Sequence, residues 1–144
     1  MFYQWNRKKA WAATGAVTDW DDTMPSGATW EAENDPSPDG WRVPTKEEFD
    51  KLADATKVEF ERTTENGVIG GRFTDKTTGK SIFIPAAGFR LNGNLLGQQI
   101  NAYCWSSTNY IVEEEAYCFT FDATSSYTHG DPYHLGFSVR PVKK

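Results

Sequence analysis

At 144 residues, the chain is long enough to bury one sizeable hydrophobic core and short enough to be a single domain (1–144). Its formal net charge of −5 provides no basic stripe to neutralise nucleic-acid phosphates or an anionic membrane surface. We therefore expect no nucleic-acid partner. No apolar run approaches the roughly 18 residues of a transmembrane helix, so we also expect no membrane insertion.

The first forty residues predict a short strand and then a long ordered loop. Residues 2–6 (FYQWN) have the aromatic composition of a strand. Residues 12–39 are rich in Gly, Pro, Asp and Thr, but they also contain Trp20 and Trp30. Because a disordered linker seldom carries tryptophan, we expect these two side chains to pin the loop.

One segment predicts a helix, near 46–55. Thr45 followed three residues later by Glu48 is a capping box, which marks a helix N-terminus. Phe49 and Leu52 then lie three residues apart, so they share one apolar face.

After the helix, apolar runs separated by turn residues predict β-structure. Residues 65–71 (ENGVIGG) and 86–98 (AAGFRLNGNLLGQ) are expected to be a turn and a loop because glycines punctuate them. The expected strands are 58–62, 103–106, 117–122 and 137–142, with a hairpin of 72–74 against 81–85. The predicted class is α+β: a small, mostly antiparallel sheet with one or two helices and long ordered loops.

No group of residues in the sequence predicts catalysis. His129, Asp131 and His134 could offer ligands to a transition metal, but they fall in a predicted loop that would not aim them. Cys104 and Cys118 have no sequence neighbours that would lower a thiol pKa. There is also no phosphate-binding glycine loop and no G-x-S-x-G motif. We therefore expect no enzyme, no cofactor and no metal site.

Two acidic stretches are interpreted as solvated surface. Asp19, Asp21 and Asp22 offer carboxylates that Ca²⁺ could use, but their spacing matches no EF-hand. Glu113–Glu115 are expected to form a turn between two strands.

The segment Ala116–Val139 has a restricted composition. It contains no Lys, Glu, Gln, Met or Trp, although those five types make up 30 of the 144 residues. About five of them would be expected in a segment of this length. Its Tyr, Ser, Thr, His and Asp residues sit between sequences that are typical of strands.

Five phrases carry a resemblance that covers nearly the whole chain: GWRVPTKEEFDKL, IPAAGFR, YCWSST, AYCFTF and GFSVRPVK. In this order they resemble a bacterial and phage family of C-type-lectin-fold domains. That family includes the Fibrobacter-type paralogous domains and the variable proteins of diversity-generating retroelements. FYQWNRK resembles the usual family start, although the strand that normally precedes it is missing.

The resemblance offers a reason for the restricted composition. In such retroelements, adenines of a template are randomised, chiefly in AAC and AAT codons. The resulting codons encode every residue type except Lys, Glu, Gln, Met and Trp. The resemblance therefore implies a variable, ligand-binding region at about 103–135.

Strand alternation predicts which residues of this region face outward. In 117–122, the aromatic residues Tyr117, Phe119 and Phe121 should point into the core and the residues between them outward. Trp105 should likewise point inward and place Cys104 on the outer face, next to Cys118. The expected ligand-binding residues, on the strands and in loops 109–112 and 124–135, are Cys104, Asn109, Tyr110, Ile111, Val112, Cys118, Thr120, Asp122, Thr124, Ser125, Ser126, Tyr127, Thr128, His129, Asp131, Tyr133, His134 and Leu135.

The composition of this set favours recognition of a target. Tyrosines offer rigid amphipathic contact area, and Ser, Thr, Asn and Asp offer adaptable hydrogen bonds. The resemblance implies a surface protein or glycan as the partner, with multivalent display on a larger particle or protein. It also implies a virion, such as a phage tail, or a bacterial cell surface as the location, within a longer protein.

Two other functions remain open from the sequence. The first is a fixed-sequence bacterial adhesin of the same fold. The second is an enzyme of the formylglycine-generating type, which shares the GWRVPT-x-x-E-F phrase, although no matching catalytic motif surrounds Cys104 or Cys118. Ca²⁺-dependent sugar binding is not expected, because the E-P-N, Q-P-D and W-N-D motifs are absent. Adjacent antiparallel strands would allow a Cys104–Cys118 disulfide, and two free thiols are the alternative.

Overall fold

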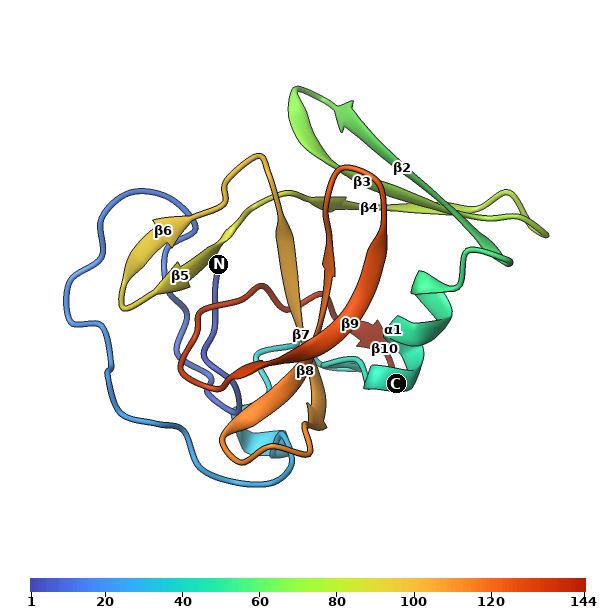
Figure 1. The fold of residues 1–144 in the computed structure, drawn as a ribbon. Helices are drawn as coiled ribbons and strands as arrows, with labels where there is room; N and C mark the ends of the chain where they lie inside the picture. Colours follow the sequence, from blue (N-terminus) through green and yellow to red (C-terminus); the bar gives the residue numbers. More distant parts are fainter.

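The regular structure consists of four small antiparallel sheets, one short α-helix and a one-turn 3-10 helix, η1 Ala32–Asn34 (Figure 1). The computed structural model describes all of residues 1–144. The structure is a small α+β domain, mostly antiparallel, as the sequence predicts. The two larger sheets are β2-β3-β4 and β7-β8-β9, and the two smaller ones are β1-β10 and β5-β6. The strands are β1 Trp41–Arg42, β2 Val58–Glu65, β3 Val68–Asp75, β4 Ser81–Pro85, β5 Phe89–Leu91, β6 Asn94–Leu96, β7 Ala102–Asn109, β8 Glu115–Phe121, β9 Ser126–Pro132 and β10 Val142–Lys143.

The predicted helix is confirmed as α1, Lys46–Ala53, which ends two residues earlier than expected. The capping box is present: the Thr45 side chain accepts a hydrogen bond from the Glu48 N–H, and the Glu48 carboxylate accepts one from the Thr45 N–H. Phe49 is buried on the face that the spacing predicts. No helix of the protein is long and apolar enough to cross a membrane.

The same Glu48 carboxylate forms a two-pronged ion pair with Arg42 of β1. Its oxygens accept hydrogen bonds from both Arg42 terminal nitrogens, at 2.6 and 2.9 Å. This contact, aided by the N–H of Thr45, lowers the pKa of Glu48 from 4.5 to about 2. The helix start is thereby tied to the β1-β10 sheet.

A Glu48→Gln variant is expected to be less stable than the wild type at neutral pH by about 1–2 kcal/mol. This is less than the full shift of the Glu48 pKa would give, because solvent screens the partly exposed ion pair. The folded pKa lies below the unfolded one, so the stabilisation is complete above about pH 4.5 and is lost as the pH falls towards 2. Urea unfolding across this range should show the difference between the two proteins shrinking. Glu47→Gln, in the same turn but exposed, is the control; a Glu48→Gln difference that stays constant with pH would contradict the assignment.

Two Asn-Gly pairs shorten the predicted turn at 65–71 to two residues and place a hairpin within the predicted loop at 86–98. Asn66-Gly67 and Asn92-Gly93 all have positive φ, between 49° and 80°. Such pairs form the two-residue turns whose twist matches that of paired strands. Asn66-Gly67 therefore lets β3 begin at Val68, and Asn92-Gly93 joins β5 to β6. The predicted hairpin of β3 and β4 is confirmed, with Phe73 opposite Ile82.

The third strand of the central sheet is a further correction. Residues 126–132, expected to be loop, form β9, which pairs with β8 along its whole length. The predicted strands 2–6 and 137–142 are reduced to isolated bridges, chiefly between Tyr3 and Phe137, and to the short β10. Ser138 also forms a parallel bridge with Cys104 of β7, but each of these pairings is limited to single bridges and does not extend into a ladder.

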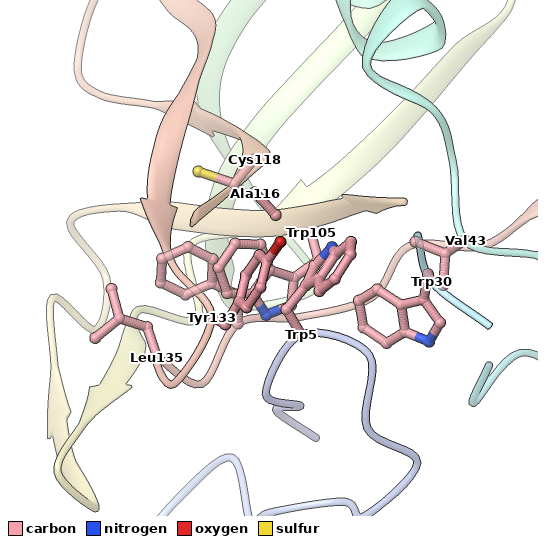
Figure 2. Close-up of a cluster of buried hydrophobic side chains, with 9 residues drawn as sticks. Trp5, Trp30, Val43, Trp105, Ala116, Cys118, Tyr133 and Leu135 are labelled. Carbon is pink, nitrogen blue, oxygen red and sulfur yellow. The ribbon is translucent and has the colours of Figure 1, made fainter. Parts of the chain in front are cut away.

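The central sheet is buried on both faces. On one face, side chains of α1 and of the β2-β3-β4 sheet pack with Phe119 and Phe121 of β8 in one hydrophobic cluster. On the other face, side chains of the N-terminal segment and of residues 133–137 form a second cluster with Cys118 (Figure 1). The first cluster includes Phe49, Phe73, Ile84, Cys104, Phe119 and Phe121. The second includes Trp5, Trp30, Trp105, Cys118, Tyr133, Leu135 and Phe137, most of them drawn in Figure 2.

The long N-terminal loop is ordered, as predicted, and is held by more than its tryptophans. The ring centroids of Trp20 and Trp11 lie 4.7 Å apart, and the Trp30 indole N–H donates a hydrogen bond to the Asn34 carbonyl. Arg90 of β5 is buried beneath the loop and donates four hydrogen bonds to main-chain carbonyls, three of them in the loop. The loop is therefore part of the frame on which the central sheet sits.

Candidate functional site

The predicted outer face of the central sheet is not one exposed face. Cys104 lies opposite Phe119, and Trp105 lies opposite Cys118. Because directly opposed residues of antiparallel strands share a face, the two cysteines lie on opposite faces. The prediction that they are neighbours on one exposed patch is wrong, since chain segments distant in sequence cover both faces of β8.

Five of the predicted site residues are buried, contrary to the prediction. They are Cys104, Cys118, Thr120, Tyr133 and Leu135. The Thr120 hydroxyl donates to the Ala102 carbonyl at 2.7 Å, and the Tyr133 ring stacks on Trp5 at 4.3 Å. These side chains belong to the frame in this structure, because each is at most 8 % exposed; only Tyr133 also lines a groove, described below.

Both cysteines are free thiols. A disulfide is excluded by the register, because side chains on opposite faces of a sheet cannot bridge. Burial raises the pKa of the Cys104 thiol to about 12. Cys104 is therefore a small apolar core residue in its chemical behaviour.

The other predicted site residues are exposed or half-buried, and they fall in three places. One place is the turn between β7 and β8, another is the turn between β8 and β9, and the third is strand β9 itself. The two turns lie at opposite ends of β8, about 20 Å apart for a strand of this length. The residues are Asn109, Tyr110, Ile111 and Val112 in the first turn; Asp122, Thr124, Ser125 and Ser126 in the second; and Tyr127, Thr128, His129 and Asp131 on β9, with His134 just beyond.

The β8–β9 turn is held by a single carboxylate. Asp122 accepts hydrogen bonds from the N–H groups of Thr124 and Ser125, at 2.9 and 3.0 Å. On β9, Thr128 faces α1 and donates to Asp50 at 2.7 Å. Thr128 therefore links β9 to the helix. The exposed Thr124 and Ser125 side chains make only long hydrogen bonds, of 3.4 and 3.5 Å, to Asp122.

The β7–β8 turn forms one wall of a groove of about 450 Å³. Its tip carries Ile111 and Val112, which are 87 % and 50 % exposed. The opposite wall is the segment 24–28, whose position is held by a hydrogen bond from the Tyr133 hydroxyl to the Gly27 carbonyl. We name this feature the Ile111 groove: the turn 109–114, the segment 24–28 and Tyr133.

The turn itself is fixed to the sheet. The Tyr110 N–H donates to the Glu115 carbonyl at 2.8 Å, and the Tyr110 ring packs edge-on against Tyr117 at 4.7 Å. Gly130 of β9 leaves the space for this ring, because a Cβ there would lie 2.6 Å from it. The exposed apolar tip therefore projects from an ordered base.

A Gly130→Ala variant is expected to lose about 1–3 kcal/mol of stability, because the added methyl group overpacks the Tyr110 ring. Urea unfolding measures this loss. In a Tyr110→Ala background, the same substitution should cost much less, since the ring that it meets is gone. Equal costs in the two backgrounds would show that Tyr110 does not pack there.

Segment 24–28 is the part of the groove that the sequence did not predict. Its residues, MPSGA, have the composition of an ordinary loop, and no spacing in the sequence relates them to the distant turn 109–114. The two meet only because the long N-terminal loop folds back over the sheet. The contact between Tyr133 and Gly27 is tertiary and has no local signal.

The β9 face brings together three side chains that can bind metals. Residues two apart on a strand share a face, so His129 and Asp131 point the same way, and Cys118 lies directly opposite His129 on β8. The sequence pattern predicts that His129 and Asp131 lie in a loop that does not orient their side chains; this is wrong, because both lie on strand β9. His134 lies outside this cluster.

Comparisons with protein-family models, with curated proteins and with solved structures find no match to this chain. The class that the structure establishes is a small, mostly antiparallel α+β domain with one short helix. An accessible surface on and around the central sheet is its candidate functional site.

Proposed function

We propose that this chain is a target-binding protein with a C-type lectin fold, the variable component of a diversity-generating retroelement. Its binding surface is the Ile111 groove together with the outer side chains of β9 and of the β8–β9 turn. The target is a surface protein or glycan, bound by contact area and hydrogen bonds without catalysis. The location is a phage tail or a bacterial cell surface, with multivalent display.

The placement of the resembling phrases supports the fold. Each of the five contributes buried residues to the two core clusters: Phe49, Ile84, Trp105, Phe119 and Phe137 come from one phrase each. Phrases that are far apart in the chain thus build one common frame. This arrangement is expected when the phrases specify a fold and the residues between them specify something else.

One observation carries the binding proposal: exposed apolar side chains stand on an ordered turn beside a groove. Large exposed apolar groups on a well-held scaffold mark interaction sites. Ile111 and Val112 offer the apolar contact, and the half-buried Tyr110 behind them is already immobilised by Tyr117. A surface with little freedom to lose on binding suits recognition.

The state of the cysteines weighs against the enzyme alternative. Thiol chemistry requires an accessible thiolate. Cys104 is buried with its pKa at about 12, and burial also raises the pKa of Cys118 well above its usual value. The two thiols also lie on opposite faces of the sheet, so they cannot act as a pair.

DNA flanking the gene tests the proposal. We expect a reverse-transcriptase gene and a near-copy of codons 100–142 that differs at template adenines. We further expect the differing codons to fall at accessible positions such as Tyr110, Ile111 and Tyr127, and not at Phe119 or Trp105. Without the repeat and the reverse transcriptase, the fixed-sequence adhesin becomes the better proposal.

A further inference from the structure

Three potential ligand atoms converge beside the central sheet. The Cys118 Sγ lies 3.2 Å from Asp131 Oδ2, and His129 Nε2 lies 3.3 Å from the same oxygen. All three atoms lie within 4.8 Å of one another. Ligand atoms bound to one tetrahedral ion at about 2.0–2.3 Å are separated by roughly 3.2–3.8 Å, so two of the three separations already fit.

The strand pairing produces this arrangement without any loop. Cys118 and His129 are directly opposed on β8 and β9, and Asp131 follows two residues along the same face. Side chains at such positions start about 5 Å apart and lean over the same patch of sheet. The ligands are therefore aimed by the most regular part of the fold.

The His129 ring has a polar atom without a hydrogen-bond partner, and this atom lies beside Cys118 Sγ and Asp131 Oδ2. Its Nε2 is enclosed and has no hydrogen-bond partner, even though the Asp131 carboxylate is near. Enclosed polar nitrogens without a partner are rare, because they lose their hydration and gain no hydrogen bond in return. A bound cation would give Nε2 an acceptor for its lone pair.

We propose that Cys118, His129 and Asp131 form a Zn²⁺-binding site on the face of the β8–β9 ladder that carries Cys118. Thiolate sulfur, imidazole nitrogen and carboxylate oxygen are together the ligand set of zinc, whereas Ca²⁺ and Mg²⁺ prefer oxygen alone. On binding, the Cys118 thiol loses its proton to solvent and its sulfur takes up the metal bond. With three protein ligands, a fourth position stays open to solvent, because His129 and Asp131 are 36 % and 21 % exposed. The site lies apart from the Ile111 groove, but His129 and Asp131 are among the β9 side chains of the proposed binding surface. Zinc binding is measured without any target, so its failure is distinguishable from failure of the proposed function.

Zinc titration of the untagged, metal-free protein tests the site. We expect one Zn²⁺ per chain with a Kd below about 10 μM by calorimetry. Co²⁺ should give the visible bands of a tetrahedral ion and a thiolate-to-cobalt charge-transfer band. His129→Gln and Asp131→Asn should each weaken binding at least about 100-fold, more than the loss of an outer-shell partner costs.

Matched variants distinguish this cluster from the ligand residues around it. His134→Gln and Asp122→Asn, which alter the same region but not the cluster, should bind zinc within about twofold of the wild type. Cys118→Ser should abolish the charge-transfer band, and circular dichroism checks its fold because Cys118 is buried. The proposal is overturned if the wild type binds no zinc at one per chain, or if binding survives both His129→Gln and Asp131→Asn.

Discussion

Replacing Arg90 with methionine is expected to lower the free energy of unfolding by at least about 3 kcal/mol. Arg90 is only 1 % exposed, and its guanidinium donates to the carbonyls of Ala12, Thr14, Gly15 and Gly93. Methionine has a similar length but no donor. Four main-chain carbonyls would lose a donor, and each costs about 1–3 kcal/mol unless water reaches it.

Urea unfolding and amide hydrogen exchange measure this effect. We expect the largest loss of protection in residues 12–15 and in the β5-β6 hairpin. The matched control is Arg62→Met. Arg62 is half-buried and also donates to two main-chain carbonyls, those of Gln99 and Ile100, but these hydrogen bonds are exposed to solvent. Its loss should cost less than about 1 kcal/mol; equal costs for the two variants would show that Arg90 does not anchor the loop.

Replacing Phe119 with alanine is expected to cost about 3–5 kcal/mol. Phe119 is fully buried, stacks on Phe49 at 5.0 Å and meets Phe73 edge-on at 5.5 Å. Its removal would leave a cavity at the junction of α1, β3 and β8, which no neighbour can fill without moving a strand. Such a loss is a large part of the stability of about 5–15 kcal/mol that is typical of a domain.

Tyr127→Ala is the control for this second prediction. Tyr127 lies on β9 within the same segment of restricted composition, but it is 46 % exposed. Its removal should change the free energy of unfolding by less than about 1 kcal/mol. Thermal or urea unfolding of the two variants gives the comparison, and a Tyr127→Ala cost as large as that of Phe119→Ala would contradict the separation of frame from surface.

The parts of the fold that could be predicted are those set by local chemistry. Thr45 and Glu48 mark the start of α1, and the spacing of Phe49 and Leu52 gives its buried face. Strand β9 could not be recognised, because its residues SYTHGDP have the composition of a loop and depend on β8 for their pairing. Asn66-Gly67 did carry a local hairpin signal, which the neighbouring glycines obscured.

The site was predictable only in part, for a reason that applies to any sheet covered on both sides. Alternation correctly buries Phe119 and Phe121, but it assigns Cys118 and Thr120 to solvent by default. Whether the second face of a strand is exposed depends on what packs against it. Here Trp5, Tyr133 and Leu135 contribute to the cluster on that face, and Trp5 lies more than a hundred residues away from β8 in the chain (Figure 2).

The central claim is that a fixed frame carries a replaceable surface. The most direct test is a saturation library that covers every position from 100 to 139, with folding scored by protease resistance. We expect most substitutions at the accessible positions, such as Ile111, Ser125 and Tyr127, to cost less than about 0.5 kcal/mol. At the buried positions Cys104, Cys118, Thr120, Tyr133 and Leu135, most should cost more than about 1 kcal/mol. Indistinguishable tolerance in the two sets, or greater tolerance at the buried positions, would contradict the account.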